Sequence, residues 1–158
     1  MSAKARQDHY AFYRPKGLTS RPIVYEHNGF CFCALICSDL TNIAHWHSLR
    51  GEVDALVAIE WNRDTKTFAS LVESAASDLH AFVVQANNRT YGDSRIRSPA
   101  DNDFARDVVQ VKGGVSDFYV IGEIDFLSLR NEQSSRSEKP KFKPLPIGYA
   151  QKKSRKTR

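Results

Sequence analysis

The stretch that decides the fold is an apolar run that ends in a cysteine, Gly29-Phe30-Cys31-Phe32-Cys33-Ala34-Leu35-Ile36-Cys37. Apolar side chains occupy both odd and even positions of this run, and in a strand those positions face opposite sides of the sheet. A strand that is apolar on both faces is typical of a sheet that is covered on two sides. The run therefore predicts a central strand.

A short helix is predicted directly after this strand. Residues 38–42 offer several side chains of the kinds that cap helix N-termini, and Trp46 and Leu49 then recur at helical spacing before Gly51. A strand, a tight turn and a helix therefore follow one another around Cys37.

The next residues predict two more strands joined by a helix. Residues 54–60 and 81–86 have the composition of buried strands, and residues 65–79 between them carry an apolar stripe at helical spacing. The stripe consists of Phe68, Leu71, Val72, Ala75 and Leu79. A helix between two strands of one sheet makes a right-handed crossover that leaves the strands parallel. The predicted fold class is therefore α/β.

The C-terminal third predicts a different arrangement. Residues 108–111 and 118–124 are strand-like and flank the turn signal Lys112-Gly113-Gly114, which favours a β-hairpin. A short helix is expected near residues 126–130.

Length and composition indicate a single domain. The chain has 158 residues, of which 41% are hydrophobic and 26% charged, as in ordinary soluble globular proteins. We divide it into an irregular leading segment (1–21), one domain (22–131) and an extended basic tail (132–158). The longest apolar run is too short to cross a bilayer, and the polar N-terminus does not resemble a signal peptide. A cytoplasmic protein without a membrane partner is expected.

The net charge of +5 is concentrated in the tail. Residues 131–158 hold nine Lys and Arg side chains and two Glu, which leaves 14 basic and 16 acidic side chains in residues 1–130. The last residues, 151–158, have the composition of a disordered basic arm that binds nucleic acid phosphates or an acidic partner. A solvated tail without a ligand is the alternative.

One of the three cysteines differs from the others. Cys31 and Cys33 occupy alternate positions of a buried strand, and we expect all the thiols to be reduced. Because no further cluster of Cys or His follows, we expect neither a metal nor another cofactor. Cys37 ends that strand just before a helix N-terminus, where backbone N–H groups and the helix dipole favour a thiolate and can hold an oxyanion. An inert buried thiol is the alternative.

The residues around Cys37 resemble a known nucleophile motif. Leu35-Ile36-Cys37-Ser38-Asp39-Leu40 is similar to the nucleophile strand of the nitrilase, or carbon-nitrogen hydrolase, superfamily. The resemblance continues through a strand ending near a Trp (55–62), a helix of small and acidic residues (71–76) and a strand ending in Asn before a Gly-Ser turn (81–96). It covers residues 29–125, most of the chain.

The resemblance implies half of a nitrilase-like αββα sandwich, namely the C-terminal half. The family uses a Cys nucleophile, a Lys that stabilises the oxyanion and a Glu as general base, which makes Cys37 and Lys16 the catalytic candidates. A solvated lysine is the alternative for Lys16, and a surface carboxylate is the simpler explanation of Glu26, which might otherwise match the family's second Glu. The base belongs to the N-terminal half, which we expect this chain to lack.

The resemblance and the sheet position together give four substrate-binding candidates. Ser38 is next to the nucleophile in the sequence. Glu60, Trp61 and Asn62 leave the neighbouring strand at the carboxyl edge, where open α/β sheets bind ligands. A Trp packed on the sheet beside a polar turn is the alternative.

A group of arginines carries a weaker functional signal. Arg95 and Arg97 alternate on a strand with Arg106 nearby, and such a cluster can hold an anion. Salt bridges to Asp101, Asp103 or Asp107 are the simpler explanation.

Two hypotheses for function follow. In the first, the complete protein is a cysteine hydrolase of linear carbon-nitrogen bonds in amides or nitriles, and this chain alone is inactive. In the second, the chain is a non-catalytic interaction module. Nitrilase-like regions that resemble it also occur in bacterial reverse-transcriptase proteins implicated in phage defence, which is an analogy for such a role. The expected partners are the missing N-terminal half or a partner chain, a second copy of this chain, and nucleic acid through the tail.

Overall fold

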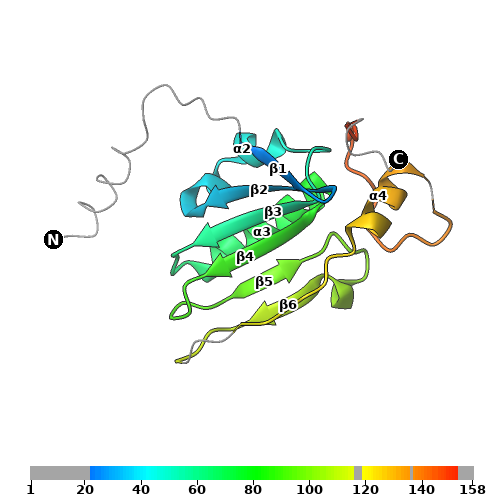
Figure 1. Ribbon diagram of the computed structural model, residues 1–158. Coiled ribbons are helices and arrows are strands. Elements are labelled where there is room, and N and C mark those ends of the chain that lie inside the picture. Colours follow the sequence, from blue (N-terminus) through cyan, green and yellow to red (C-terminus); the bar gives the residue numbers. More distant parts are fainter. Residues whose placement is uncertain (1–21, 116–118, 136, 153–158) are drawn as a thin grey trace, which may run out of the picture.

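The computed structural model describes residues 22–115, 119–135 and 137–152. Its centre is a six-stranded sheet with the strand order β1-β2-β3-β4-β5-β6 (Figure 1). The strands are β1 (Val24–His27), β2 (Phe30–Ile36), β3 (Ala55–Glu60), β4 (Phe82–Asn87), β5 (Ser94–Arg97) and β6 (Asp107–Val111). The helical elements are η1 (Cys37–Thr41), α2 (Ile43–His47), α3 (Thr65–Leu79), η2 (Asp103–Ala105) and α4 (Phe126–Ser134).

The three central strands have the predicted arrangement. β2 pairs with β3 and β3 with β4, both in parallel, and α3 makes the connection between β3 and β4. The helix begins where Asp64 accepts a hydrogen bond from the Thr67 N–H (3.1 Å), an N-cap that satisfies one of the free donors of the first turn. These elements confirm the predicted α/β class.

The outer strands are antiparallel to their neighbours. β1 and β2 are joined by Asn28 and Gly29, whose φ angles of 49° and 80° are those that a two-residue hairpin turn requires. β5 pairs with β4 on one side and with β6 on the other. The parallel centre is therefore flanked by antiparallel edges.

The structure corrects the predicted hairpin between residues 108–111 and 118–124. β6 pairs with β5 instead, and the described residues 119–124 include no strand. A Cβ added at Gly122 would lie 2.7 Å from Val109 Cγ2 and 2.8 Å from Ile96 Cδ1. The returning chain thus packs closely on side chains of β5 and β6, and its backbone does not pair with β6.

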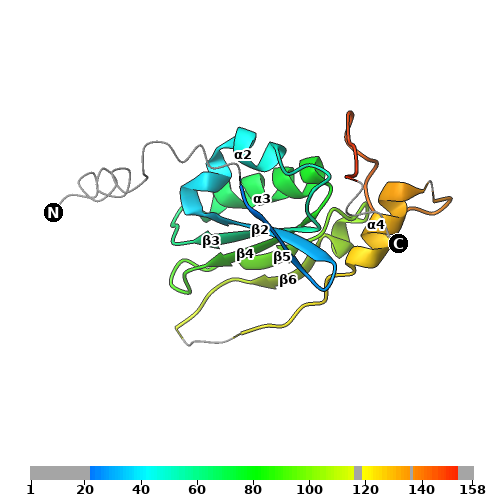
Figure 2. The ribbon, with the colours of Figure 1, turned by 45° about the horizontal axis from the view of Figure 1, so that its top comes forward.

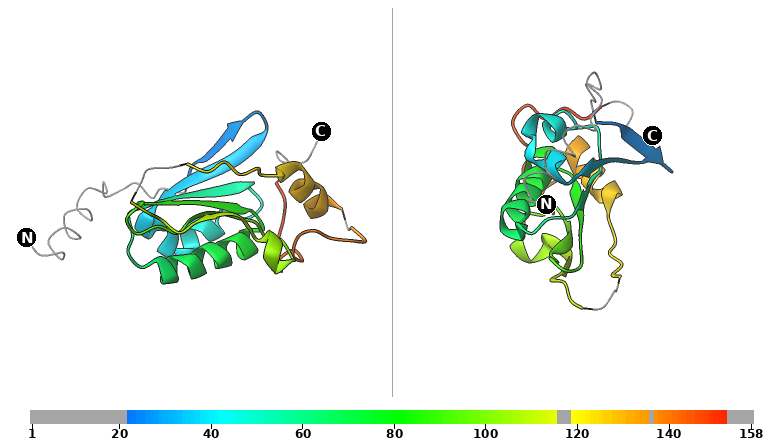
Figure 3. Two further views of the ribbon diagram at one scale, coloured as in Figure 1. Left: turned by 90° about the horizontal axis from the view of Figure 1, so that it is seen from below. Right: turned by 90° about the vertical axis from the view of Figure 1, so that its left-hand side faces the viewer.

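The two faces of the sheet are covered differently. Helices α2 and α3 lie on one face (Figures 2 and 3) and bury a core that includes Leu56 and Val72, each 0% exposed. On the other face, a second core gathers at the amino ends of the central strands, where Leu129 of α4 and Phe142 pack with Phe82.

The carboxyl half of that second face exposes apolar side chains. We call it the open patch, and it consists of Ala34, Ile36, Ile59 and Ala86. Ile36 is 66% exposed and Ile59 51%. Exposed apolar patches on a sheet mark interaction surfaces. The fold is therefore one sheet with α2 and α3 on one face and an open patch at the carboxyl half of the other, as in half of a nitrilase-like sandwich.

The described part of the C-terminal segment packs with the domain. α4 continues past residue 131, where we placed a boundary, and Phe142 is buried. The Lys143 N–H donates to the Pro99 carbonyl (2.9 Å). Residues 153–158 of the basic tail lie outside the described residues. Within the described residues, the structure contains no helix of the length and apolarity needed to span a membrane.

Candidate active site

Cys37 lies at the point where the chain leaves the carboxyl end of β2. It is the first residue of η1, and its φ of 44° places it in the left-handed region that residues with a side chain seldom adopt. Such backbone strain clusters at functional sites, because the surrounding structure must hold the residue in place. Enzymes of the α/β-hydrolase fold expose their nucleophile on a sharp strand-to-helix turn of this kind.

Two contacts hold this turn. The Asp39 carboxylate accepts a hydrogen bond from the Ile36 N–H (3.3 Å), and the Trp46 indole Nε1 donates to the Leu40 carbonyl (3.1 Å). Leu40 and Trp46 are both buried and anchor η1 and α2 on the sheet. Because η1 and α2 have five residues each, their dipoles are weak and give little support to the predicted activation of Cys37 by a helix dipole. The strained backbone and the partial exposure of Cys37 are the features that make it a candidate nucleophile.

The three thiols have different surroundings, and all three are free. Cys33 is fully buried, and its burial raises the pKa of the thiol to about 11. Cys31 is 8% exposed, and its sulfur lies 3.7 Å from Nη2 of Arg130. Cys37 is partly exposed. Of the three cysteines, it is the one that is not buried.

The predicted substrate-binding residues lie at the same edge of the sheet as Cys37. Ile36 is in register with Ile59. Cys37 and Ser38 therefore follow β2 at the edge where β3 ends with Glu60 and is followed by Trp61 and Asn62. Trp61 is 69% exposed, which contradicts the alternative of a Trp packed on the sheet. The structure thus brings the five residues to one edge, and their roles stay predictions.

Asn87 organises this edge, although the sequence indicated only that it belongs to a polar turn. Its side-chain Oδ1 accepts from the Asn62 N–H (2.9 Å), and its Nδ2 donates to the Asn62 carbonyl (2.8 Å) and to the Gly92 carbonyl (2.9 Å). One amide side chain therefore fixes the loop that carries Trp61 to the end of the next strand. The signal in the sequence was an Asn at the end of a strand, a residue that often bonds nearby backbone.

Glu60 points toward a buried polar cluster. It is 6% exposed, its Oε2 accepts from Gln85 Nε2 (2.9 Å), and its Oε1 is a buried atom without a partner among the described residues. Burial raises the pKa of Glu60, although the Gln85 hydrogen bond and the charge of Arg95 oppose that effect. The carboxyl of Glu60 is thus directed toward β4 and β5, and a buried carboxyl with a raised pKa is a recognised feature of functional sites.

The arginine cluster forms salt bridges within the chain, which is the simpler of the two explanations that we expected. Arg97 pairs with Asp107 (2.8 Å) and with Glu73 of α3 (2.9 Å), and Arg106 pairs with Asp103. Arg95 pairs with Asp93, a partner that we did not anticipate. These guanidinium groups are engaged by carboxylates of the chain itself.

The resemblance made Lys16 a catalytic candidate, and it offered Glu26 a possible match to the family's second Glu. Lys16 lies outside the described residues. Glu26 is exposed, and it lies in register with Cys31, at the opposite end of β2 from Cys37. The structure therefore does not bring Glu26 to the candidate site.

Comparisons with known proteins support the fold. No protein-family model and no curated protein sequence matched the chain. Among solved structures, an amidase of the nitrilase superfamily from Nesterenkonia AN1 matches with a TM-score of 0.55 and 15% identity, over 74% of this chain and 45% of that chain. A glutamine-dependent NAD+ synthetase from Acinetobacter baumannii gives a TM-score of 0.49 and 22% identity, over 62% of this chain and 20% of that chain.

The chain spans less than half of the amidase that it matches. At this low identity the likeness concerns the fold alone. The sheet, its helix-covered face and its open patch fit one part of a larger αββα structure. The chain has a partial nitrilase-like, carbon-nitrogen hydrolase fold.

Proposed function

We propose that this chain is the nucleophile-bearing half of a cysteine hydrolase that cleaves linear carbon-nitrogen bonds. The observation that carries the proposal is Cys37, a partly exposed thiol on a strained turn at the carboxyl end of a central parallel strand. The fold around it is the one found in a nitrilase-superfamily amidase. Carboxyl edges of parallel strands are the usual ligand sites of open α/β sheets.

The proposed reaction on an amide has two steps. The Cys37 sulfur attacks the carbonyl carbon as a general base takes the thiol proton, and the C–N bond breaks as the nitrogen leaves with that proton. Water then attacks the resulting thioester, gives up a proton to the base, and releases the acid and the thiol. Lys16 is the proposed oxyanion donor, and Ser38, Trp61 and Asn62 are the proposed walls of the substrate site.

The open patch supports the need for a second half. Ile36 and Ile59 are exposed on the face that, in a two-sheet sandwich, packs on the other sheet. We propose that this second half covers the patch and supplies the base, as a Glu. It is either another segment of the same protein or a partner chain.

The test is to complete the protein and measure hydrolysis. The chain joined to, or mixed with, the segment that supplies the second half should release ammonia from small aliphatic amides, and Cys37→Ala should abolish the release. Cys33→Ala is the control, because that thiol is buried away from the site. Mass spectrometry of the completed protein should capture an acyl group on Cys37.

A non-catalytic interaction module is the second candidate, and the open patch also suits it. It predicts that Cys37→Ser keeps the full biological function and that the completed protein hydrolyses no amide or nitrile. The association with a reverse transcriptase, a second copy of the chain and nucleic acid binding by the tail stay predictions of this candidate. A loss of salt-sensitive nucleic acid binding on deletion of residues 150–158 would support it.

We also propose a cytoplasmic location. The three cysteines are free, as expected in a reducing compartment. Thiol labelling of the protein in intact cells, before and after reduction, tests this proposal.

A further inference from the structure

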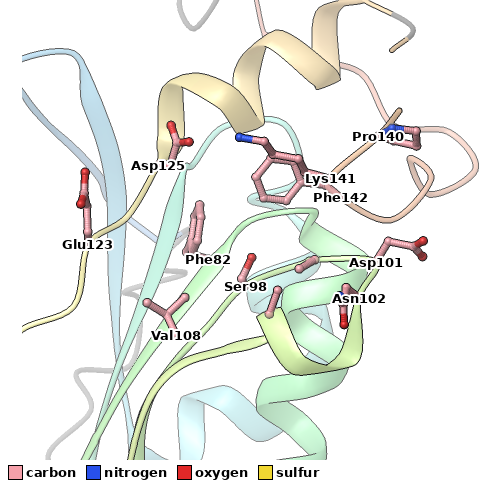
Figure 4. A pocket seen from close by; sticks show the side chains of 12 residues that line it. Phe82, Ser98, Asp101, Asn102, Val108, Glu123, Asp125, Pro140, Lys141 and Phe142 are labelled. Atoms are coloured by element: carbon pink, nitrogen blue, oxygen red, sulfur yellow. The ribbon is translucent and has the colours of Figure 1, made fainter. Parts of the chain in front are cut away.

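A hollow lies at the opposite end of the sheet from Cys37. It has a volume of about 420 Å³, is open to solvent, and is lined by residues of β4, β6 and the segments 98–105, 123–125 and 140–142 (Figure 4). Phe82, the first residue of β4, forms part of its wall, whereas Cys37 follows the last residue of β2, which runs in the same direction. The hollow is large enough for a small organic ligand and is separate from the candidate active site.

The wall of the hollow is aromatic. Phe82 and Phe142 are 3% and 6% exposed, and their ring centroids are 6.3 Å apart with an angle of 82° between the planes. Both side chains border the space in Figure 4, with Val108 beside them. Two rings at right angles offer one ring face and one ring edge to a flat apolar group.

The hydroxyl of Ser98 points into this space. Ser98 is 5% exposed, and its N–H donates to the Arg106 carbonyl (2.6 Å). Its hydroxyl has no hydrogen-bond partner among the described residues, and Figure 4 shows it directed between Phe82 and Phe142. The hydroxyl can therefore donate a hydrogen bond to, or accept one from, a polar atom of a ligand at this place.

The charges around the hollow are mainly negative. Asp101, Glu123 and Asp125 contribute three carboxylates, and Lys141 contributes one ammonium group. Glu123 forms no ion pair with another described residue. Hydrogen bonds from Ser128 to Asp125, the N-cap of α4, and the charge of Lys141 lower the pKa of Asp125 and keep it ionised. This charge balance attracts a cation and repels an anion.

We propose that the hollow binds a small primary arylalkylammonium cation. The aromatic ring lies against Phe82 and Phe142, and a ring hydroxyl bonds Ser98. The ammonium group faces Glu123 and Asp125. This binding site goes beyond the proposed hydrolase activity, because it takes its residues from the far end of the sheet.

Tyramine is the probe, and its anionic analogue 3-(4-hydroxyphenyl)propanoate is the control for charge. In an NMR titration of the full chain, tyramine should shift the amide signals of residues 82, 98 and 142. The anion should bind roughly tenfold more weakly at low salt. Equal binding of the two compounds, or no shift of these signals by tyramine, would overturn the proposal.

Two matched variants locate the ammonium group. Asp125→Asn and Asp64→Asn each remove one carboxylate from a helix N-cap, and Asn keeps the capping acceptor in both. Asp125→Asn should weaken tyramine binding about threefold, and Asp64→Asn should leave it unchanged. Equal effects of the two variants contradict the proposed position.

A third variant locates the ring hydroxyl. Ser98→Ala should weaken the binding of tyramine about fivefold and leave 2-phenylethylamine, which lacks the hydroxyl, unaffected. An equal loss for both amines contradicts the Ser98 contact.

Discussion

Asp54, at the start of β3, and Arg130, in α4, form a buried ion pair that ties the C-terminal helix to the sheet. The Arg130 Nε donates to Asp54 Oδ1 (2.8 Å), and the two residues are 0% and 6% exposed. Asp54 Oδ2 also accepts from the Cys31 N–H (2.7 Å), and Arg130 Nη2 donates to the Gly29 carbonyl (2.6 Å). One guanidinium group thus links α4 to the turn between β1 and β2 and to the residue that precedes β3.

Arg130→Ala should therefore lower the free energy of unfolding strongly. The substitution leaves the Asp54 carboxylate buried without its cation, which costs about 3 kcal/mol or more. Urea unfolding followed by circular dichroism measures the change. Arg63→Ala removes an exposed arginine and should change stability by less than about 0.5 kcal/mol. If the two variants unfold at the same urea concentration, the ion pair does not hold α4.

Glu60→Gln should stabilise the fold at neutral pH by about 1 kcal/mol. The fold raises the pKa of Glu60, so the folded state disfavours the carboxylate, and stability is lost as the pH rises from the unfolded-state pKa through the folded one. Gln is neutral at every pH, and its NH₂ can donate to Gln85 Oε1, a buried atom without a partner among the described residues. The gain should disappear in acid, as thermal unfolding at pH 3 and pH 7 would show. A gain of the same size at both values would contradict the pKa effect.

Iodoacetamide should alkylate Cys37 before Cys31 and Cys33 at neutral pH. Cys37 is partly exposed, whereas Cys33 is fully buried with a pKa of about 11. Peptide mapping by mass spectrometry after short reaction times gives the order. Equal, slow labelling of all three thiols in the folded protein would show that Cys37 is an inert, buried thiol.

Between pH 9 and 11 the raised pKa of Cys33 should make the stability of the fold decrease as the pH rises, because the unfolded state loses the thiol proton at a lower pH than the folded state.

Ile36→Ser should roughly halve the binding of a dye that reports exposed apolar surface. Ile36 is 66% exposed within the open patch, beside Ile59. Ile147→Ser is the matched control, since Ile147 is 99% exposed but lies outside the patch. Fluorescence titration with an anilinonaphthalene sulfonate dye measures the difference. The same decrease for both variants would mean that the patch is not a distinct surface.

The sequence was sufficient where a local pattern specifies a local structure. The apolar run of β2 and the helical stripe of α3 predicted a buried strand and a helix, and α3 has the predicted bounds, Thr65–Leu79. The strand-helix-strand order then required parallel neighbours. The position of Cys37 at the end of a central strand follows from the same pattern.

The hairpin shows where local pattern fails. Two strand-like segments flank Gly113, and this pattern predicted that they pair with each other. In the structure β6 pairs with β5 instead. Strand propensity shows that a segment can pair, whereas the choice of partner depends on packing across the sheet.

Only the tertiary structure decided the contacts between distant residues. Asp54 and Arg130 are 76 positions apart, and Asn87 bonds Asn62 across 25 positions, so no periodicity within either segment reveals the pair. The left-handed backbone of Cys37, the inward direction of Glu60 and the hollow beside Ser98 likewise arise when elements meet. The sequence by itself determined the central strands, the helix between them and the place of the candidate nucleophile at the end of β2. Register and packing determined what surrounds each side chain, because those energies come from residues that are neighbours only after folding.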